Sequence, residues 1–414
     1  MPVKKKKFEY QPLSLKNILR KMKQNIDLMI DLAYSAIKFG SKELAEETSE
    51  IEKNIHELTF LLNLQIIQTN AGGFKRAKKL EPIVVMGYSI DKISDALADI
   101  AHVVKINSDI TQFTTLFWDY VPEPIVTVKI CEGCEFEGQF RRDIHFRSKQ
   151  GVDLIAIIRD GKFLFEKTER IFKGDILIVK GEKGPIRELK AKCCDTEPVS
   201  FDLEHEVVEP IFNLDNPEVK EYLIDLKKLY IQITDISETM TELAMAALFF
   251  NNYELAEDVL EMEELMDGLN ITFEKELLDF SHYMENPRDL TGILRIVFSC
   301  EQISDAAANI AENVLRGFKV HEILQEAVKE TSEVVVRETL SEDSFFKYKT
   351  YEQLQDRRYK RGFHIIALKR ENKWIYSFKP DFVFLKGDLI IGLGPKETVE
   401  QWKKCVHPEK YKED

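Results

Sequence analysis

The sequence lacks the features that mark a disulfide-bonded or membrane-spanning protein. Only 6 of its 414 residues are cysteine, too few for a disulfide scaffold and typical of a reduced cytosolic protein. The most apolar stretch, 83–104, is interrupted by three aspartates, so no run of about 18 apolar residues exists to cross a bilayer. No apolar signal segment follows the lysines at 4–7. We therefore expect a cytoplasmic protein without a membrane span.

Basic residues are outnumbered by acidic ones. The chain has 72 acidic and 58 basic residues and a net charge of −14, which argues against a nucleic-acid partner because phosphate binding requires a basic surface. No glycine-rich phosphate loop, no GxGxxG after a strand and no His-Glu-x-x-His pattern occurs. We therefore expect no enzymatic activity, and a metal-dependent hydrolase is the least favoured alternative.

The chain is an internal tandem duplication. The segment 299–306 (SCEQISDA) resembles 89–96 (SIDKISDA) at an offset of 305 − 95 = 210, and Lys173-Gly174-Asp175 recurs as Lys386-Gly387-Asp388 at an offset of 388 − 175 = 213. A steady offset of this length indicates a duplicated module and not a solenoid, whose period is roughly 20–50 residues.

Each copy begins with a helical part. Apolar residues recur at spacings of three and four, and the predicted helices are joined by short connections, as in an antiparallel bundle. Ser41 is expected to cap the second helix, and Pro82 to lie in the connection before the third. In the second copy Asn251 or Asn252 should begin the second helix and Asn286-Pro287 should open the third.

Each copy ends with a strand-rich part. Short alternating or continuous apolar segments predict four strands per copy, and a helix is expected in 133–148. The fold class is therefore α+β multidomain, with two three-helix bundles alternating with two small α+β domains. The predicted domains are 1–112, 113–200, 201–328 and 329–414, and the predicted strands are 125–130, 152–158, 163–165, 175–179, 334–336, 364–368, 374–376 and 388–393.

The third helix of each bundle carries an acidic pattern. Glu301-xxx-Asp305-xxx-Asn309-Ile-Ala-Glu strongly resembles the signature helix of PhoU domains, and Asp91-xxx-Asp95-xxx-Asp99-Ile-Ala-His is a weaker version. The second helices fit the same pattern with Glu263-xxx-Asp267 and Glu52-xxx-His56, although His56 departs from the acidic consensus.

The strand-rich parts resemble TrkA-C domains, the ligand-sensing modules of potassium-channel and transporter regulators. In that family a glycine precedes a strand that ends in arginine, and a Gly-Asp pair opens the last strand, as it does in both copies here. The segments are 151–159 with 174–181, and 362–370 with 387–394. The module order PhoU, TrkA-C, PhoU, TrkA-C is similar to that of prokaryotic, mainly archaeal, proteins.

Carboxylates at i and i+4 share a helix face and repel each other unless a cation neutralises them. The resemblance implies iron or zinc, and oxygen ligands also suit magnesium, calcium or manganese. The alternative is an exposed acidic face; Asn309 is expected to bond across to a neighbouring helix, and His102 and His56 are expected to be ordinary surface histidines. The second copy keeps the pattern better. The candidate metal ligands are Glu52, Asp91, Asp95, Glu263, Asp267, Glu301 and Asp305.

Arg159 and Arg370 end the strands that the TrkA-C resemblance identifies. That resemblance implies a cleft for a small anion, a metal or cyclic di-adenylate, and a guanidinium is suited to phosphate. The alternative is that these arginines pair with carboxylates such as Asp160 and Glu371. One CxxC pair, Cys131 and Cys134, is too few ligands for a structural zinc site.

The sequence thus favours a regulator that binds a small effector and acts on a membrane channel or transporter of potassium or another cation. A metal-loaded regulator of phosphate uptake is the alternative. Because each module is supplied twice, we expect both pairs to associate within the chain as a pseudo-two-fold monomer, with a homodimer as the alternative assembly.

Overall fold

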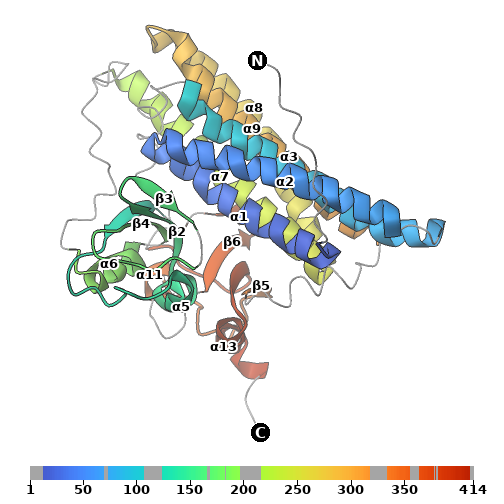
Figure 1. Ribbon diagram of the computed structural model, residues 1–414. Coiled ribbons are helices and arrows are strands. Elements are labelled where there is room, and N and C mark those ends of the chain that lie inside the picture. The colour runs from blue at the N-terminus through green and yellow to red at the C-terminus, as the bar shows by residue number, and fades with distance from the viewer. Residues whose placement is uncertain are drawn as a thin grey trace.

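Helices dominate the protein, and two small sheets lie on one side of them (Figure 1). None of the described helices combines the length and the apolar composition that crossing a bilayer requires. The predicted domain boundaries at 112, 200 and 328, and Gly362, lie outside the described residues. The computed structural model describes residues 13–69, 73–106, 124–165, 168–181, 183–195, 216–317, 333–354, 363–376, 378 and 381–410.

The first bundle begins and ends its helices with local capping contacts. The Ser14 hydroxyl accepts a hydrogen bond from the Asn17 N–H at 3.2 Å, and Gly40 ends the first helix at φ 57°. Ser41 caps the second helix through the Leu44 N–H, as predicted. Pro82 was placed wrongly, because it lies inside the third helix, two turns after its start. The helices are α1 (Leu15–Phe39), α2 (Lys42–Thr69) and α3 (Phe74–Ile106).

The second bundle repeats this plan with asparagine caps. Asn216 accepts from the Glu218 N–H and Asn252 from the Leu255 N–H, which decides between the two predicted starts of the second helix. The Asn286-Pro287 pair opens a short 3₁₀ segment (Pro287–Leu290), and the third helix follows it directly. The helices are α7 (Pro217–Phe250), α8 (Tyr253–Phe280) and α9 (Thr291–Leu315).

The two bundles pack against each other within the chain. Helix α3 lies along α9, and one apolar core continues through both bundles. The buried Tyr34 hydroxyl of α1 lies 3.3 Å from the Ser237 hydroxyl of α7, and Asn313 of α9 donates to Glu81 of α3. This arrangement agrees with the expected intramolecular pairing of the helical parts.

The two sheets have the same topology. Each is antiparallel, with its first strand beside its fourth and its third at the other edge. Each second strand has an irregularity at the same place, Leu154/Ala156 and Ile365/Ala367, which are 211 residues apart. The strands are β1 (Ile125–Lys129), β2 (Val152–Arg159), β3 (Lys162–Leu164), β4 (Ile176–Gly181), β5 (Glu333–Thr339), β6 (His364–Arg370), β7 (Lys373–Ile375) and β8 (Leu389–Pro395).

The helix expected in 133–148 is wrong for most of its length. Gly133 and Gly138 have φ of 88° and 80°, and His145 has φ 54°, so the backbone turns repeatedly there. Only a short helix and a π turn form, α5 (Arg141–Ile144) and the segment Phe146–Gln150. The helices that cover the sheets follow the last strands instead and were not predicted: α6 (Lys183–Lys192) and α13 (Lys396–Val406), with the short α11 (Tyr351–Leu354) beside the latter sheet.

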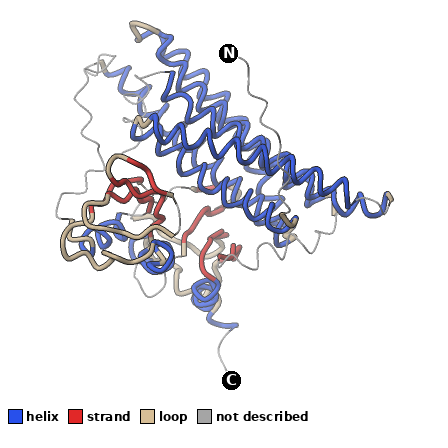
Figure 2. The backbone as a smooth tube through the Cα atoms, viewed as in Figure 1, coloured by secondary structure: helices blue, strands red, loops and turns tan. Residues whose placement is uncertain are grey.

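Each sheet has one face in its own small core and the other against the helices. Ile155 and Ala156 of β2, and Ile366 and Ala367 of β6, belong to the core of the bundles. Both sheets lie on the same side of the helical layer (Figure 2). The expected pairing of the two sheet domains with each other stays a prediction.

Candidate functional site

The acidic patterns of the first bundle meet between α2 and α3. His56 Nε2 lies 2.9 Å from Asp95 Oδ1 and 3.6 Å from Asp91 Oδ1. Glu52, His56 and Asp95 form the only His, Cys, Asp or Glu trio in the described part of the chain whose ligand atoms all lie within 4.8 Å of one another. A histidine with two carboxylates is a donor set that zinc, iron and manganese accept.

The electrostatics of this cluster favour a positive charge. Burial opposes the charged imidazole, but the bond to Asp95 and the charges of Asp91, Asp95 and Glu52 outweigh it and raise the pKa of His56. Burial raises the pKa of Glu52 and Asp91, which His56 partly offsets. A proton on His56 therefore offsets part of the negative charge of the three carboxylates, and a metal ion would have to displace that proton.

The second bundle gathers carboxylates without a histidine. Burial, and then the charges of neighbouring carboxylates, raise the pKa of Glu263, Glu301 and Asp305, with Asp267 contributing to all three. The Asn309 side chain donates to the Asp305 carbonyl of its own helix at 2.8 Å, so the predicted bond to a neighbouring helix is wrong. The preference for this copy as the metal site stays a prediction, and the first copy holds its ligand atoms closer together.

We expect Asp305→Asn to raise the free energy of unfolding of the metal-free protein at pH 7 by about 0.5 kcal/mol, because it removes one of several repelling charges. The folded pKa of Asp305 is raised above its ordinary value of 3.8. The wild-type protein therefore loses stability as Asp305 ionises with rising pH, and the stability gained by Asp305→Asn should shrink toward pH 4. Urea unfolding with and without MnCl₂ measures this, and a manganese site requires the variant to lose the manganese-dependent stabilisation. Asp27→Asn is the control with opposite sign, since Asp27 is paired with Lys23 at 2.6 Å.

Arg159 and Arg370 each form a two-pronged contact with a buried aspartate. Arg159 Nε and Nη2 both lie 2.8 Å from Asp175 oxygens, and Arg370 makes the same contacts with Asp388 at 2.7 Å. Each aspartate is 1% exposed. The predicted partners Asp160 and Glu371 are therefore not the ones that form these forks.

The forks hold the turn before the last strand. Asp175 also accepts from the Phe172 N–H, and Asp388 from the Leu385 N–H, while Gly174 and Gly387 take φ of 91° and 86°. Each guanidinium also donates to a backbone carbonyl. Most donors of these arginines are therefore used inside the domain, which leaves few for an effector.

Two pairs of cysteines, Cys131 with Cys134 and Cys193 with Cys194, lie in the first sheet domain. The Cys131 N–H donates to the Cys193 carbonyl at 3.1 Å. Burial raises the pKa of both the Cys134 and the Cys193 thiols. Protonated thiols are poor nucleophiles, so this burial disfavours nucleophilic or redox chemistry at Cys134 and Cys193.

Ion pairs join the sheets to the helices, and the sequence pattern did not reveal them. Lys180 of β4 pairs with Glu238 of α7 and lies 3.8 Å from Asp31 of α1. In the other sheet Arg337 of β5 contacts Asp258 of α8 at 2.7 Å. Such contacts join segments between 58 and 149 residues apart (238 − 180 and 180 − 31), which local spacing cannot predict. A further pair is formed by Lys369 of β6 and Glu261 of α8.

Asp31 makes the first of these junctions sensitive to pH. Burial raises the pKa of Asp31 to about 7, although Lys180 lowers it in part. Because the folded pKa lies above the ordinary value of 3.8, stability is highest at low pH and is lost as pH rises from about 4 to about 7. The side chain is 25% exposed, so we expect a loss of about 2 kcal/mol, half of what the full shift implies. Asp31→Asn should flatten this dependence in urea unfolding between pH 5 and 8, and an unchanged slope would contradict the assignment.

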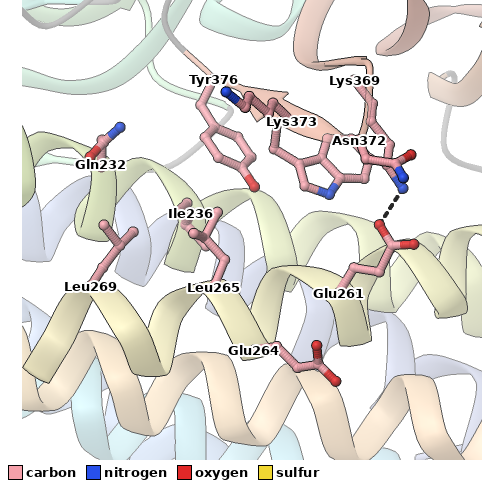
Figure 3. A pocket seen from close by; sticks show the side chains of 11 residues that line it. Gln232, Ile236, Glu261, Glu264, Leu265, Leu269, Lys369, Asn372, Lys373 and Tyr376 are labelled. Atoms are coloured by element: carbon pink, nitrogen blue, oxygen red, sulfur yellow. Dashed lines mark hydrogen bonds and ion pairs between the residues drawn. The ribbon is translucent and has the colours of Figure 1, made fainter.

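A cavity of about 480 Å³ lies between the β6–β7 hairpin and helices α7 and α8 (Figure 3). The helices line it with the apolar Ile236, Leu265 and Leu269 and with the polar Gln232, Glu261 and Glu264. The Tyr376 ring points from the hairpin toward the helices (Figure 3), and Trp374 also lines the cavity. Its size is within the range of small-molecule sites. Nothing in the sequence pattern pointed to this cavity.

Comparison with known proteins identifies the helical parts. The PhoU domain family matches residues 19–104 and 230–314, which are the two helical bundles. The chain contains two PhoU domains. No curated protein matches the sequence. The matched ranges do not include the sheet domains, so their likeness to TrkA-C domains remains an expectation.

Solved structures resemble the chain weakly. The crystal structure of PhoU from Pseudomonas aeruginosa aligns with 73% of this chain and 96% of its own, at 15% identity and a TM-score of 0.35. The GsuK RCK domain aligns with 77% of this chain and 79% of its own, at 12% identity and a TM-score of 0.17. The PhoU domains are therefore identified by their sequence match.

Proposed function

We propose that the protein is a non-catalytic cytoplasmic regulator. Its two PhoU domains are typical of a regulatory protein. In this proposal the sheet domains bind a small effector, and the PhoU domains pass the resulting change to a membrane channel or transporter of potassium or another cation. The cation and the sensing role come from the sequence resemblance of the sheet domains to TrkA-C domains.

The observation that supports this proposal is the packing of both sheets on the PhoU helices. Each sheet buries one face in the helical core and adds ion pairs to the contact, among them Lys180 with Glu238 and Arg337 with Asp258. A change in either sheet therefore alters contacts to α1, α7 or α8. An effector can shift the bundle only if it binds the two arrangements differently, and this junction is where such a difference would arise.

Uptake measurements in the source organism test the proposal. Deleting the gene should change the initial rate of rubidium uptake, a tracer for potassium, by severalfold and leave phosphate uptake unchanged. The wild-type chain should restore the rate, and Arg337→Ala should restore it poorly. Normal rubidium uptake with altered phosphate uptake would contradict it.

The second candidate function is metal-dependent regulation of phosphate uptake. The observation in its favour is the Glu52, His56 and Asp95 trio in the first PhoU domain. This function requires His56→Ala to abolish zinc or manganese binding in calorimetry and to reproduce the phosphate-uptake defect of the deletion. Wild-type protein that binds neither metal would eliminate it.

A further inference from the structure

One face of the second PhoU domain combines carboxylates with apolar side chains. On each of its two helices the residues follow one another at spacings of three and four, so each row lies on one side of its helix. Helices α8 and α9 pack along each other. We call this set the outer face, and it consists of Glu263, Asp267, Ile271, Glu274 and Leu278 of α8 and Phe298, Glu301 and Asp305 of α9.

The carboxylates of the two rows lie close to one another. The charges of Asp267 and Asp305 both act on Glu263. The charge of Glu274 acts on Glu301 in the same way. None of these five carboxylates forms an ion pair within the described part of the chain, so the outer face carries negative charge that the protein itself does not neutralise.

The apolar residues of the outer face are exposed in both repeats. Leu278 is 62% exposed and Phe298 55%. The first repeat has the apolar Ile67 and Tyr88 at the corresponding positions (278 − 67 = 211; 298 − 88 = 210), and they are 71% and 58% exposed. A single exposed apolar residue is ordinary, but two that recur at matched positions without being buried indicate a contact outside the chain.

Helix α8 presents the outer face and the sheet contact on opposite sides. Asp258 pairs with Arg337 of β5. Asp267 follows Asp258 by nine residues (267 − 258 = 9), which is about two and a half turns at 3.6 residues per turn. A partner on the outer face and the second sheet would therefore contact the same helix from its two sides.

We propose that the outer face docks a basic amphipathic helix supplied by a cytoplasmic segment of a membrane transport protein. Its apolar side packs on Ile271, Leu278 and Phe298, as helices do in apolar grooves. Its lysines and arginines pair with the five carboxylates, and cytoplasmic segments next to membrane spans are rich in these residues. The row on α8 from Glu263 to Leu278 is about 22 Å long, which matches a helix of about 16 residues.

The second repeat is the stronger docking site. In the first repeat His56 replaces Asp267 and Lys92 replaces Gln302 (267 − 56 = 211; 302 − 92 = 210), so the corresponding face is less negative. The inference rests on the proposed function for its biological meaning, because it names the surface by which the regulator reaches its membrane partner.

Fluorescence anisotropy of the full chain with a labelled model peptide tests the proposal. The peptide has about 16 residues, leucine and lysine in the order that makes one apolar and one basic side of a helix, and the buffer contains EDTA so that no divalent cation competes for the carboxylates. We expect one tight site per chain. Phe298→Ala should weaken binding about tenfold, as loss of an aromatic anchor does, and Glu301→Gln combined with Asp305→Asn should weaken binding and reduce its salt dependence.

Matched controls separate docking from general attraction to an acidic protein. Ile224→Ala removes an apolar residue that is 53% exposed on α7 of the same PhoU domain, and Glu285→Gln removes an exposed charge outside the outer face. Both should leave affinity unchanged. A peptide of the same composition in strictly alternating order should bind at least tenfold more weakly, since its helix has no apolar side. Phe298→Ala should keep the wild-type melting temperature because the residue is exposed.

Four outcomes would overturn the inference. They are no binding, equal binding of the alternating peptide, binding that Phe298→Ala leaves unchanged, and light scattering that shows a homodimer which Phe298→Ala dissociates, because a second copy of the chain would then occupy the outer face. Full recovery of rubidium uptake by the Phe298→Ala chain would contradict the docking face alone. Unchanged uptake after gene deletion would instead contradict the proposed function, so the two failures are distinguishable.

Discussion

Replacing Arg370 with alanine should lower the free energy of unfolding by about 3 kcal/mol, because it leaves the carboxylate of Asp388 buried without its counter-charge. Asp388 is 1% exposed and receives both prongs of the guanidinium at 2.7 Å. The Leu385 N–H is the contact that remains, and one amide does not replace a guanidinium. Urea unfolding followed by circular dichroism measures the change.

Arg316→Ala is the control for this experiment. Arg316 pairs with Glu312 one turn away on an exposed helix face at 3.3 Å, and such pairs contribute at most about 0.5 kcal/mol. Arg370→Lys should fall between the two, since it keeps the charge and loses the second prong. If Arg370→Ala proved as mild as Arg316→Ala, the guanidinium would be free to serve an effector, as the sequence resemblance implied.

Arg337→Ala should have a comparable effect, again about 3 kcal/mol, at the junction of sheet and bundle. Asp258 is 3% exposed, and burial raises its pKa against the lowering effect of Arg337. Without Arg337 that pKa should rise further. A raised folded pKa means stability that is lost as pH rises, so the deficit of Arg337→Ala should be larger at pH 7 than at pH 5.

Two comparisons make this prediction specific. Asp258→Asn combined with Arg337→Ala should recover part of the loss, because no buried charge then remains unpaired. The first repeat has Thr127 at the corresponding position (337 − 127 = 210) and uses Lys180 instead. A deficit of Arg337→Ala that is equal at both pH values would exclude an unpaired Asp258 as its cause.

The repeat and the long helices could be predicted from the sequence because their signals are local. Capping by Ser41 and Asn252 and the three-to-four spacing of apolar residues both act within a few residues of chain. The strand ends were placed to within three residues for the same reason. Pro82 misled the prediction, because proline in a sequence usually marks a helix start and here lies within α3.

Features that depend on distant contacts could not be predicted in this way. Arg159 was predicted to contact an effector, with neighbouring Asp160 as the alternative partner, whereas its partner Asp175 is brought near by the pairing of β2 with β4. The same contact recurs between Arg370 and Asp388. The Arg and the Gly-Asp are therefore present in both copies because each copy contains this internal contact. The segment 133–148 has no strong period, and its turns follow from positive φ at two glycines.

The candidate sites also differ in whether they depend on local spacing or on contacts between distant segments. The acidic residues of the third helices could be placed on one face by spacing alone, and the structure brings His56, which departed from the pattern, against Asp95. The cavity beneath Trp374 could not be anticipated, because it forms between α7, α8 and a hairpin about 100 residues later.

Amide hydrogen exchange in Arg337→Ala, with Arg316→Ala as the control, tests most directly whether sheet and bundle form one responsive unit. The structure predicts faster exchange in β5 and, together with it, in the part of α8 around Asp258, while Arg316→Ala leaves both at wild-type rates. Faster exchange confined to β5, with α8 unchanged, would show that the sheet moves independently of the PhoU helices and would contradict the proposed coupling.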